Sequence, residues 1–330
     1  MLKIGVIGAG HLGKIHINCI KLISDYELVG FYDTNSEIVE RIKAEFGITP
    51  FESFDSLIDS VDVVDIVTPT FAHFEYAAYA LKRFKHVFIE KPIVTTPAEA
   101  LQLMDIAHEA NVKVQVGHVE RFNPAFLAAL PYFENPMFIE SHRLSGFNTR
   151  GIDVPVILDL MIHDIDIVLN VVKANIRKIS ASGVSVISNS ADIASARLEF
   201  DNGCVANLTA SRVSLKTMRK SRFFQKDAYI AVDFLNKEAE IVRIANLNGN
   251  KPVPGLPLLD PGNGKEPRQL SFEKPAIQPI NAIQTELSSF AEAILRNTAP
   301  PVTIMDGYQA LQVSHQILDK VNHSLSKLQM

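Results

Sequence analysis

Cysteine is scarce in this chain. Its 330 residues include two cysteines, Cys19 and Cys204, whose separation fits no metal-binding pattern. Two cysteines form at most one disulfide, so a disulfide scaffold is excluded and a reducing compartment is the simpler inference.

An excess of positive charge and a long apolar run are also missing. The net charge of -5 and the pI of about 6.1 give no electrostatic case for binding nucleic acid or an anionic membrane. No apolar run reaches the roughly 18 residues that cross a bilayer. The apolar residues 4–7 run directly into Gly8 and do not have the design of a signal peptide. We therefore expect a cytoplasmic protein with no nucleic-acid or membrane partner.

What the chain does contain is typical of a globular protein of two domains. Hydrophobic residues make up 47% of it and charged residues 21%. The length exceeds the usual size of one domain. We expect a first domain at residues 1–119 and a second at 120–330, whose terminal helices can return to the first.

Strands and helices alternate in the first 120 residues. Near-continuous Val and Ile, as at 61–67, indicate strands that are buried on both faces of a parallel sheet. Strands are predicted at 3–7, 27–32, 61–67, 86–89 and 113–116, and helices at 14–23, 36–46 with Ser36 as cap, 74–82 and 97–110. This alternation predicts an α/β domain with a doubly wound parallel sheet.

The run Gly8-Ala9-Gly10-His11-Leu12-Gly13 follows the first strand and opens the first helix. Glycines in this GxGxxG pattern allow a tight turn and a close approach to a pyrophosphate, which the helix N-terminus favours. Asp33 lies 20 residues beyond Gly13, at the end of the next strand, where a carboxylate binds an adenosine ribose. Dinucleotide binding is favoured over a purely structural turn.

Asp33 also bears on the choice of dinucleotide. Its carboxylate would repel the 2′-phosphate of NADP, and Thr34-Asn35-Ser36 supplies no arginine to compensate. NAD is therefore preferred to NADP, although Arg41 in the following helix could still reach the phosphate.

Lys91 ends the apolar run 86–89, within Glu90-Lys91-Pro92. The carboxyl ends of parallel strands open into the crevice where α/β sheets bind ligands, so Lys91 is a candidate site residue. The alternative is a solvated lysine in a turn that Pro92 begins.

The second half of the chain loses the alternation. Consecutive strands at 179–186, 194–200, 204–211, 228–234 and 240–244, with a hairpin turn at Asp201-Asn202-Gly203, predict an antiparallel sheet in an α+β domain. Residues 251–279 contain seven prolines and three glycines and are expected to form a surface excursion, as a lid, an oligomer contact or a plain loop. Helices at 281–296 and 306–325 close the chain.

The apolar segment 157–169 carries Asp159 and His163 four residues apart, on one helix face, with Asp166 a turn further on. An acidic residue beside a histidine stabilises the protonated ring and suits proton transfer. A structural Asp–His pair and a metal site formed with Asp166 are the alternatives that the spacing leaves open.

These motifs, in order, are the glycine run, Asp33, Thr68-Pro69-Thr70 with His73, Glu90-Lys91-Pro92 and Asp159 to His163. Together they resemble the glucose-fructose oxidoreductase, inositol dehydrogenase and rhizopine catabolism (Gfo/Idh/MocA) family of nicotinamide-dependent sugar oxidoreductases. The resemblance implies a Rossmann domain, a second domain with an open-faced, largely antiparallel sheet that often forms homodimers or homotetramers, and a site between them. It also implies a cis Lys91–Pro92 bond.

The resemblance assigns roles to the site residues. It implies that Lys91 and His163 assist proton transfer with support from Asp159, and that Glu90 contacts nicotinamide or anchors Lys91. The expected cofactor contacts are Gly8, Gly10, His11, Leu12, Gly13, Asp33, Thr68, Pro69, His73, Glu90 and Lys91. No metal is expected.

Residues 117–125 resemble the members of this family that act as UDP-N-acetylglucosamine 3-dehydrogenases. In this segment Arg121 and Asn123 are candidate substrate ligands, beside His163, because a guanidinium binds phosphate or carboxylate bidentately. The alternative for Arg121 is an interdomain salt bridge. The basic stretch 212–226 is expected to be a solvated face, or else a site for a diphosphate or a partner subunit.

The predicted activity is hydride transfer between NAD and a secondary hydroxyl of a sugar, cyclitol or sugar nucleotide. A non-enzymatic dinucleotide sensor and an NAD-dependent glycosidase are the competing interpretations, and neither differs from the dehydrogenase in its cofactor site.

Overall fold

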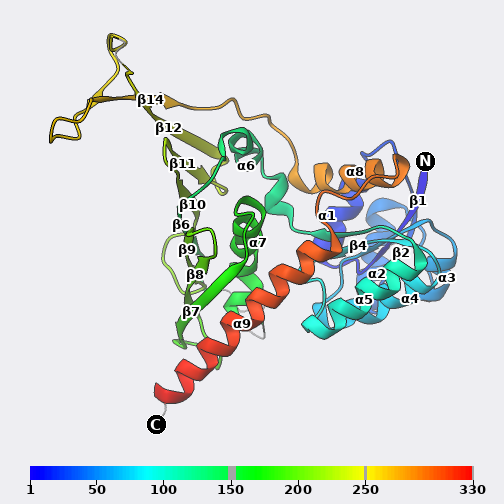
Figure 1. Cartoon of the computed structure of the whole chain (residues 1–330). Coiled ribbons are helices and arrows are strands. Elements are labelled where there is room, and N and C mark those ends of the chain that lie inside the picture. Colours follow the sequence, from blue (N-terminus) through cyan, green and yellow to red (C-terminus); the bar gives the residue numbers. More distant parts are fainter. Residues whose placement is uncertain (148–153, 249–250, 329–330) are drawn as a thin grey trace. The chain divides into compact units, whose positions relative to one another are not determined.

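The computed structural model of the chain describes residues 1–147, 154–248 and 251–328. It divides into two compact units (Figure 1). The first unit comprises Met1–Phe122 and Asn281–His315, and the second comprises Asn123–Ile280 and Gln316–Met330. The chain therefore leaves the first unit after residue 122 and returns to it at residue 281.

The first unit is built on a parallel sheet of five strands in the order β2-β1-β3-β4-β5. Its elements are β1 (Leu2–Ile7), α1 (His11–Ile20), β2 (Tyr26–Tyr32), α2 (Ser36–Phe46), α3 (Phe54–Asp59), β3 (Val63–Ile66), the 3₁₀ turn η1 (Thr70–Ala72), α4 (His73–Lys82), β4 (His86–Glu90), α5 (Pro97–Ala110), β5 (Val114–Gly117), the 3₁₀ turn η2 (Val119–Phe122), α8 (Ala282–Leu295) and the start of α9 (Ile304–Leu328). The predicted doubly wound parallel sheet is confirmed.

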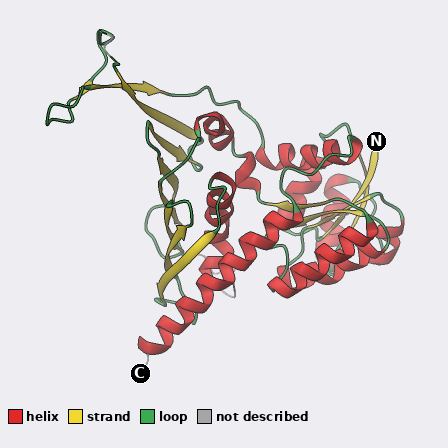
Figure 2. Ribbon diagram, viewed as in Figure 1, coloured by secondary structure: helices red, strands yellow, loops and turns green. Residues whose placement is uncertain are grey.

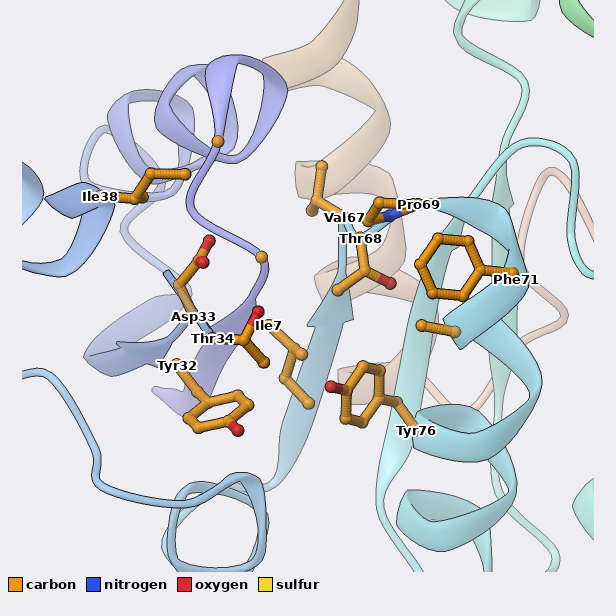
Figure 3. A pocket seen from close by; sticks show the side chains of 13 residues that line it. Ile7, Tyr32, Asp33, Thr34, Ile38, Val67, Thr68, Pro69, Phe71 and Tyr76 are labelled. Atoms are coloured by element: carbon orange, nitrogen blue, oxygen red, sulfur yellow. The ribbon is translucent and has the colours of Figure 1, made fainter. Parts of the chain in front are cut away.

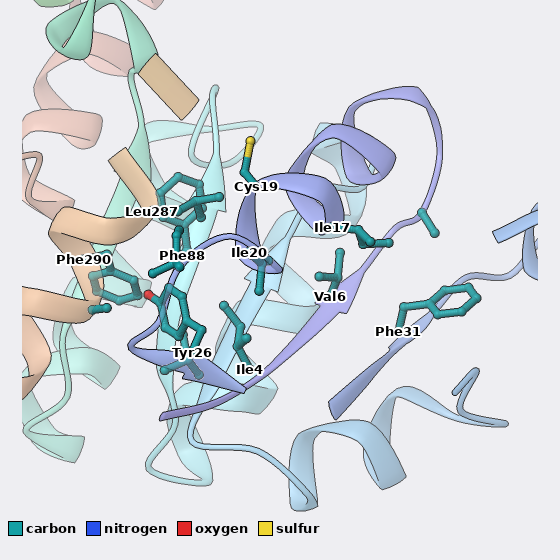
Figure 4. Packing of buried hydrophobic residues seen from close by; sticks show 14 of the residues in the cluster. Ile4, Val6, Ile17, Cys19, Ile20, Tyr26, Phe31, Phe88, Leu287 and Phe290 are labelled. Atoms are coloured by element: carbon teal, nitrogen blue, oxygen red, sulfur yellow. The ribbon is translucent and has the colours of Figure 1, made fainter. Parts of the chain in front are cut away.

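Apolar side chains from several elements form the core of this unit. Ile4 and Val6 of β1 belong to one buried cluster with Phe88 of β4 and with Leu287 and Phe290 of α8 (Figure 4). The Phe88 and Phe290 rings lie 6.1 Å apart, centroid to centroid. Burying a side chain of this size is worth about 1.5–3 kcal/mol, so the cluster holds α8 on the sheet.

The helix starts show why local sequence defines these elements. Helix α5 begins with a capping box, in which the Thr96 hydroxyl accepts from Glu99 N and the Glu99 carboxylate accepts from Thr96 N. For α2 the predicted cap Ser36 was wrong, because Asn35 precedes it in an extended conformation and its Oδ1 accepts from Glu37 N at 2.9 Å. Helix α3 was not predicted.

The second unit is built on a nine-stranded sheet in the order β13-β14-β12-β11-β10-β6-β9-β8-β7. Figure 2 shows strands in yellow and helices in red. Its elements are α6 (Pro124–Ala129), the 3₁₀ turn η3 (Leu130–Tyr132), β6 (Phe138–Leu144), the π-helical turn η4 (Ile157–Met161), α7 (Ile162–Val171), β7 (Ile176–Val184), β8 (Ile193–Phe200), β9 (Val205–Ser211), β10 (Met218–Phe224), β11 (Ala228–Asp233), β12 (Glu238–Asn246), β13 (Leu258–Leu259), β14 (Arg268–Glu273) and the end of α9. All neighbours are antiparallel except β6 and β9.

The sheet has one covered face. Helix α6 packs on β11 and β12, and α7 packs on β6 and β9. Side chains alternate along β6, where Ile139, Ser141 and Arg143 are buried and their neighbours are half-buried. The predicted α+β domain with an open-faced, largely antiparallel sheet is confirmed, as is the hairpin at 201–203, where Gly203 has a φ of 87°.

Two segments of this unit have more regular structure than expected. Part of the basic stretch 212–226 forms β10, a strand inside the sheet between β6 and β11, and its charged side chains are exposed or half-buried, as expected for a solvated face. Lys220 pairs with Asp233 of β11 at 2.9 Å. The excursion 251–279 is not plain loop, since β13 and β14 extend the sheet beyond β12.

Within the described residues, no helix combines the length and the apolar character that crossing a bilayer needs.

Candidate active site

The turn after β1 has the geometry of a dinucleotide-binding turn. Gly8 has a φ of 93°, and a Cβ on Gly13 would overlap the Gly8 carbonyl oxygen, so both positions require glycine. A Cβ on Gly10 would meet no atom within 4 Å. The turn is therefore packed closely where helix meets strand and open at Gly10, where a pyrophosphate would approach.

Helix α1 starts directly after this turn. Gly10 is its N-cap and no side chain caps its first turn. The first N–H groups of a helix have no partner within the helix and carry partial positive charge, which favours an anion. His11 and Leu12 lie in this first turn and are exposed.

Asp33 ties the end of β2 to the glycine turn. Its Oδ2 accepts from Ala9 N at 2.7 Å and its Oδ1 accepts from Asn35 N at 2.8 Å. Each carboxylate oxygen has a second lone pair, so Asp33 can still bind ribose hydroxyls.

A cavity of about 350 Å³ lies beside this carboxylate (Figure 3). Phe71 and Tyr76 lie across it from Asp33. Its lining residues are Ile7, Gly8, Gly10, Tyr32, Asp33, Thr34, Ile38, Val67, Thr68, Pro69, Phe71, Ala72 and Tyr76. Apolar walls with one carboxylate and an open glycine turn fit the adenosine and pyrophosphate of NAD.

We expect Gly10→Val to weaken NAD binding by about 10-fold or more while the unfolding temperature stays nearly unchanged. A Cβ at this position meets no protein atom within 4 Å, so we expect the fold to tolerate the change, but the side chain fills the space that the dinucleotide must enter. Calorimetric titration with NAD and thermal unfolding measure the two effects. Gly13→Ala is the contrasting variant and should lower both, and wild-type NAD affinity in Gly10→Val would show that the pyrophosphate binds elsewhere.

His73 lies behind the cavity rather than along it. Its Nε2 is 2.8 Å from the Thr68 carbonyl oxygen and its Nδ1 is 2.9 Å from that of Pro92. The ring is buried, and burial lowers its pKa. His73 therefore joins the loop after β3, which carries Thr68 and Pro69 into the cavity, to the turn after β4.

Glu90 and Lys91 stand at the carboxyl end of β4, and the Lys91–Pro92 bond is cis. Lys91 is half-buried, and Glu90 is 8% exposed. Glu90 Oε2 accepts from the Lys91 backbone N–H at 3.1 Å. These contacts are those of an anchor for Lys91, one of the two roles that the sequence left open for Glu90.

The partner of Glu90 was not predicted from the sequence. His16 of α1 places its Nε2 3.3 Å from Glu90 Oε1 and its Nδ1 2.9 Å from Asp65 Oδ2. The only signal for it was a histidine between two isoleucines of the first helix, and such a histidine is as often structural.

Arg121 and Asn123 have structural partners. Arg121 Nη2 is 3.1 Å from Asp306 Oδ1 of α9, within the first unit. Asn123 caps α6 by accepting from Ala125 N at 3.1 Å, and it donates to the Phe234 carbonyl oxygen at 2.9 Å. Their role as substrate ligands stays a prediction.

Asp159 and His163 belong to the second unit. Asp159 lies in the π-helical turn η4 and His163 in the first turn of α7. Of the eight residues from Met161 to Val168, His163 alone is not buried. Asp159 is half-buried, whereas Asp166 is 1% exposed. A wide helical turn thus presents one acid and one histidine at the accessible side of a buried helix.

No group of three or more His, Cys, Asp or Glu side chains that could hold a metal ion occurs in the described parts of the chain.

The sequence matches define the class of protein. Residues 2–118 match the model of an oxidoreductase family with an NAD-binding Rossmann fold, and residues 136–224 match the GFO/IDH/MocA C-terminal domain. The chain belongs to the Gfo/Idh/MocA family and is an NAD-dependent oxidoreductase, as the sequence predicted.

Particular relatives are similar over most of the chain. UDP-N-acetylglucosamine 3-dehydrogenase of Acidithiobacillus ferrooxidans is 39% identical over 257 residues, which cover 78% of this chain and 80% of that enzyme. A solved structure of this enzyme, GnnA, has a TM-score of 0.88 at 34% identity and covers 98% of both chains. The scyllo-inositol 2-dehydrogenase (NAD(+)) of Bacillus subtilis is 29% identical over 64% of this chain and 68% of its own.

Proposed function

We propose that this protein oxidises the 3-hydroxyl of a UDP-linked N-acetylhexosamine with NAD. The proposed substrate rests on the similarity to UDP-N-acetylglucosamine 3-dehydrogenase, at 39% identity over 80% of that enzyme. The glycine turn, Asp33 and the open cavity between them support NAD as the oxidant.

When bound, NAD accepts the hydride that leaves the carbinol carbon of the substrate. The residues of the chain itself remove the hydroxyl proton. Of Lys91 and His163, one removes this proton and the other donates a hydrogen bond to the oxygen that becomes the ketone. Asp159, four residues before His163 in the same helical segment, supports the histidine, and Glu90 holds the backbone of Lys91.

The direct test is an activity panel. The purified protein is mixed with NAD or NADP and with UDP-N-acetylglucosamine, UDP-N-acetylgalactosamine, N-acetylglucosamine, glucose 6-phosphate or myo-inositol, while reduced nicotinamide is followed by absorbance. We expect kcat/KM for a UDP-N-acetylhexosamine to exceed that for the free sugars and the cyclitol by about 100-fold or more, since a bound diphosphate adds several charge-assisted contacts. Activity confined to free polyols would refute the substrate.

We expect Asp33→Asn to lower the preference for NAD over NADP by about 10-fold or more in kcat/KM. The carboxylate binds ribose hydroxyls with charge-assisted hydrogen bonds worth about 1.5–3 kcal/mol, and it repels a 2′-phosphate. The single oxygen of an asparagine can still accept from Ala9 N–H, so the glycine turn should persist, although the bond from Asn35 N–H is lost.

The matched control for this variant is Asp62→Asn. Asp62 also accepts a backbone N–H, from Lys3 at 2.9 Å, but it does not line the cavity. Its replacement should leave the ratio unchanged, whereas an unchanged ratio in Asp33→Asn would mean that the ribose binds elsewhere.

The proposal also includes a cytoplasmic location and a homodimer or homotetramer. The half-buried side chains on the second face of the nine-stranded sheet support association with another copy.

A further inference from the structure

Three ionisable side chains form a buried row that leads to Lys91. Asp65 of β3 and His16 of α1 are both 0% exposed, and Glu90 of β4 is 8% exposed. The imidazole joins the two carboxylates, with Nδ1 2.9 Å from Asp65 and Nε2 3.3 Å from Glu90. Charged side chains are almost never buried this completely unless they are paired, so the row requires an explanation.

Lys91 continues the row on its accessible side. The second oxygen of Glu90 accepts the Lys91 N–H, and the ammonium of Lys91 lowers the pKa of Glu90, after the larger effects of burial, which raises it, and of His16, which lowers it. Carboxylate, imidazolium, carboxylate and ammonium then alternate in sign, and their formal charges sum to zero.

The surroundings fix Glu90 in this orientation. A Cβ on Gly117 of the neighbouring strand β5 would lie 2.6 Å from Glu90 Oε1, so only glycine leaves room for the carboxylate there. The Phe88 ring and the imidazole pack in a T-shaped arrangement, with 5.8 Å between their centroids.

Nδ1 is hydrogen-bonded to Asp65, whereas Nε2 faces Glu90 at ion-pair distance without the geometry of a hydrogen bond. The ring opposes the charges of both buried carboxylates only if both nitrogens carry protons. Burial by itself lowers the pKa of His16, but Asp65 and then Glu90 raise it well above its ordinary value. The other titratable groups that face this row are the Cys19 thiol, the Tyr26 hydroxyl and His73.

We propose that His16 and Asp65 are positioning residues for the oxidation, which act through Glu90 on Lys91. The imidazolium holds the Glu90 carboxylate in the orientation that binds Lys91 N–H, and so it sets where the Lys91 side chain leaves the sheet. The inference rests on the proposed role of Lys91 in proton transfer. It adds a histidine and an aspartate that are fully buried and do not line the cavity beside Asp33.

If the row were purely structural, mutation of its residues would affect folding and would leave kcat of the folded protein unchanged. A positioning row affects kcat more than KM, because misplaced proton transfer raises the barrier without weakening binding. It also predicts that His16 and Glu90 act as one unit, so that their effects on kcat do not add.

The test is a mutant cycle with His16→Gln, Glu90→Gln and the double variant. We expect His16→Gln to lower kcat by about 10-fold or more with KM for NAD within about 3-fold, and the double variant to lie within about 3-fold of Glu90→Gln. His86→Gln is the matched control, because His86 lies at the other end of β4, accepts from Lys113 N at 3.0 Å and should leave kcat unchanged. Wild-type kcat in folded His16→Gln, or multiplicative effects in the double variant, would overturn the proposal.

A second measurement does not depend on substrate. Nitrogen-15 NMR of histidine-labelled protein should show the His16 ring, assigned by its loss in His16→Gln, protonated on both nitrogens at pH 7.5, and Asp65→Asn should return it to a neutral ring. A neutral His16 ring in the wild-type protein would contradict the alternating charges of the row. A protonated ring in a protein that oxidises none of the panel substrates would refute the proposed function and leave the row intact. If His16→Gln does not fold, Asp65→Asn carries the same two readouts.

Discussion

Replacement of Lys91 by methionine should lower kcat by about 100-fold or more, equal to about 2.7 kcal/mol of transition-state stabilisation. The Lys91 side chain is half-buried. Methionine retains most of its aliphatic part and removes the ammonium group. NAD affinity should stay within about 3-fold of wild type, because Lys91 is not among the residues that line the cavity beside Asp33. Steady-state kinetics and calorimetric titration with NAD measure the two quantities.

Lys85→Met is the matched control for this variant. Lys85 directly precedes β4, at the opposite end from Lys91, and is also half-buried. Its loss should change neither kcat nor NAD affinity. Full activity in Lys91→Met would remove the lysine from the reaction, whereas an equal loss in both variants would indicate a general effect of charge on this sheet.

The cofactor half of the site could be predicted because its signals are local. Gly8, Gly10 and Gly13 follow one another within a single turn. The fold requires glycine at positions 8 and 13, whereas Gly10 leaves open the space that a pyrophosphate would enter. Asp33 follows at a fixed distance because one helix and one strand separate it from the turn. Short-range geometry of this kind leaves a pattern in one stretch of sequence.

The row behind Lys91 could not be predicted for the opposite reason. His16, Asp65 and Glu90 come from three elements and meet only when the sheet places β3 beside β4 and α1 against them. In sequence, Asp65 stands in an apolar strand and His16 in an apolar helix. Neither stretch of sequence indicates which residue forms the ion pair with Asp65 or with His16.

The same limit applies to the second sheet. Strand β10 contains Arg219, Lys220 and Arg222, which suggest a solvated stretch. The carboxylate partners of Lys220 and Arg222 are Asp233 and Glu140, which lie on the two neighbouring strands. A charged strand inside a sheet is stabilised by cross-strand pairs that a single stretch of sequence does not contain.

His163→Asn should also lower kcat by about 100-fold or more, with little effect on stability or NAD affinity. His163 alone among Met161 to Val168 is not buried, so its replacement leaves no cavity in the core and should cost less than about 1 kcal/mol of unfolding free energy. The residues that line the NAD cavity all belong to the first unit. The loss should therefore appear in kcat and in the pH profile of kcat/KM, where removal of the histidine abolishes one limb.

Two further variants separate the roles of Asp159 and His163. They are Asp159→Asn and a control substitution at a remote histidine. If Asp159 supports the ring, Asp159→Asn lowers kcat less than His163→Asn does, and the double variant is no slower than His163→Asn alone. His323→Asn, at an exposed position of α9, should match wild type. A wild-type pH profile in His163→Asn would assign the hydroxyl proton to Lys91 alone. Loss of both limbs in Lys91→Met, with one limb kept in His163→Asn, would make the lysine the base and the histidine its hydrogen-bonding partner.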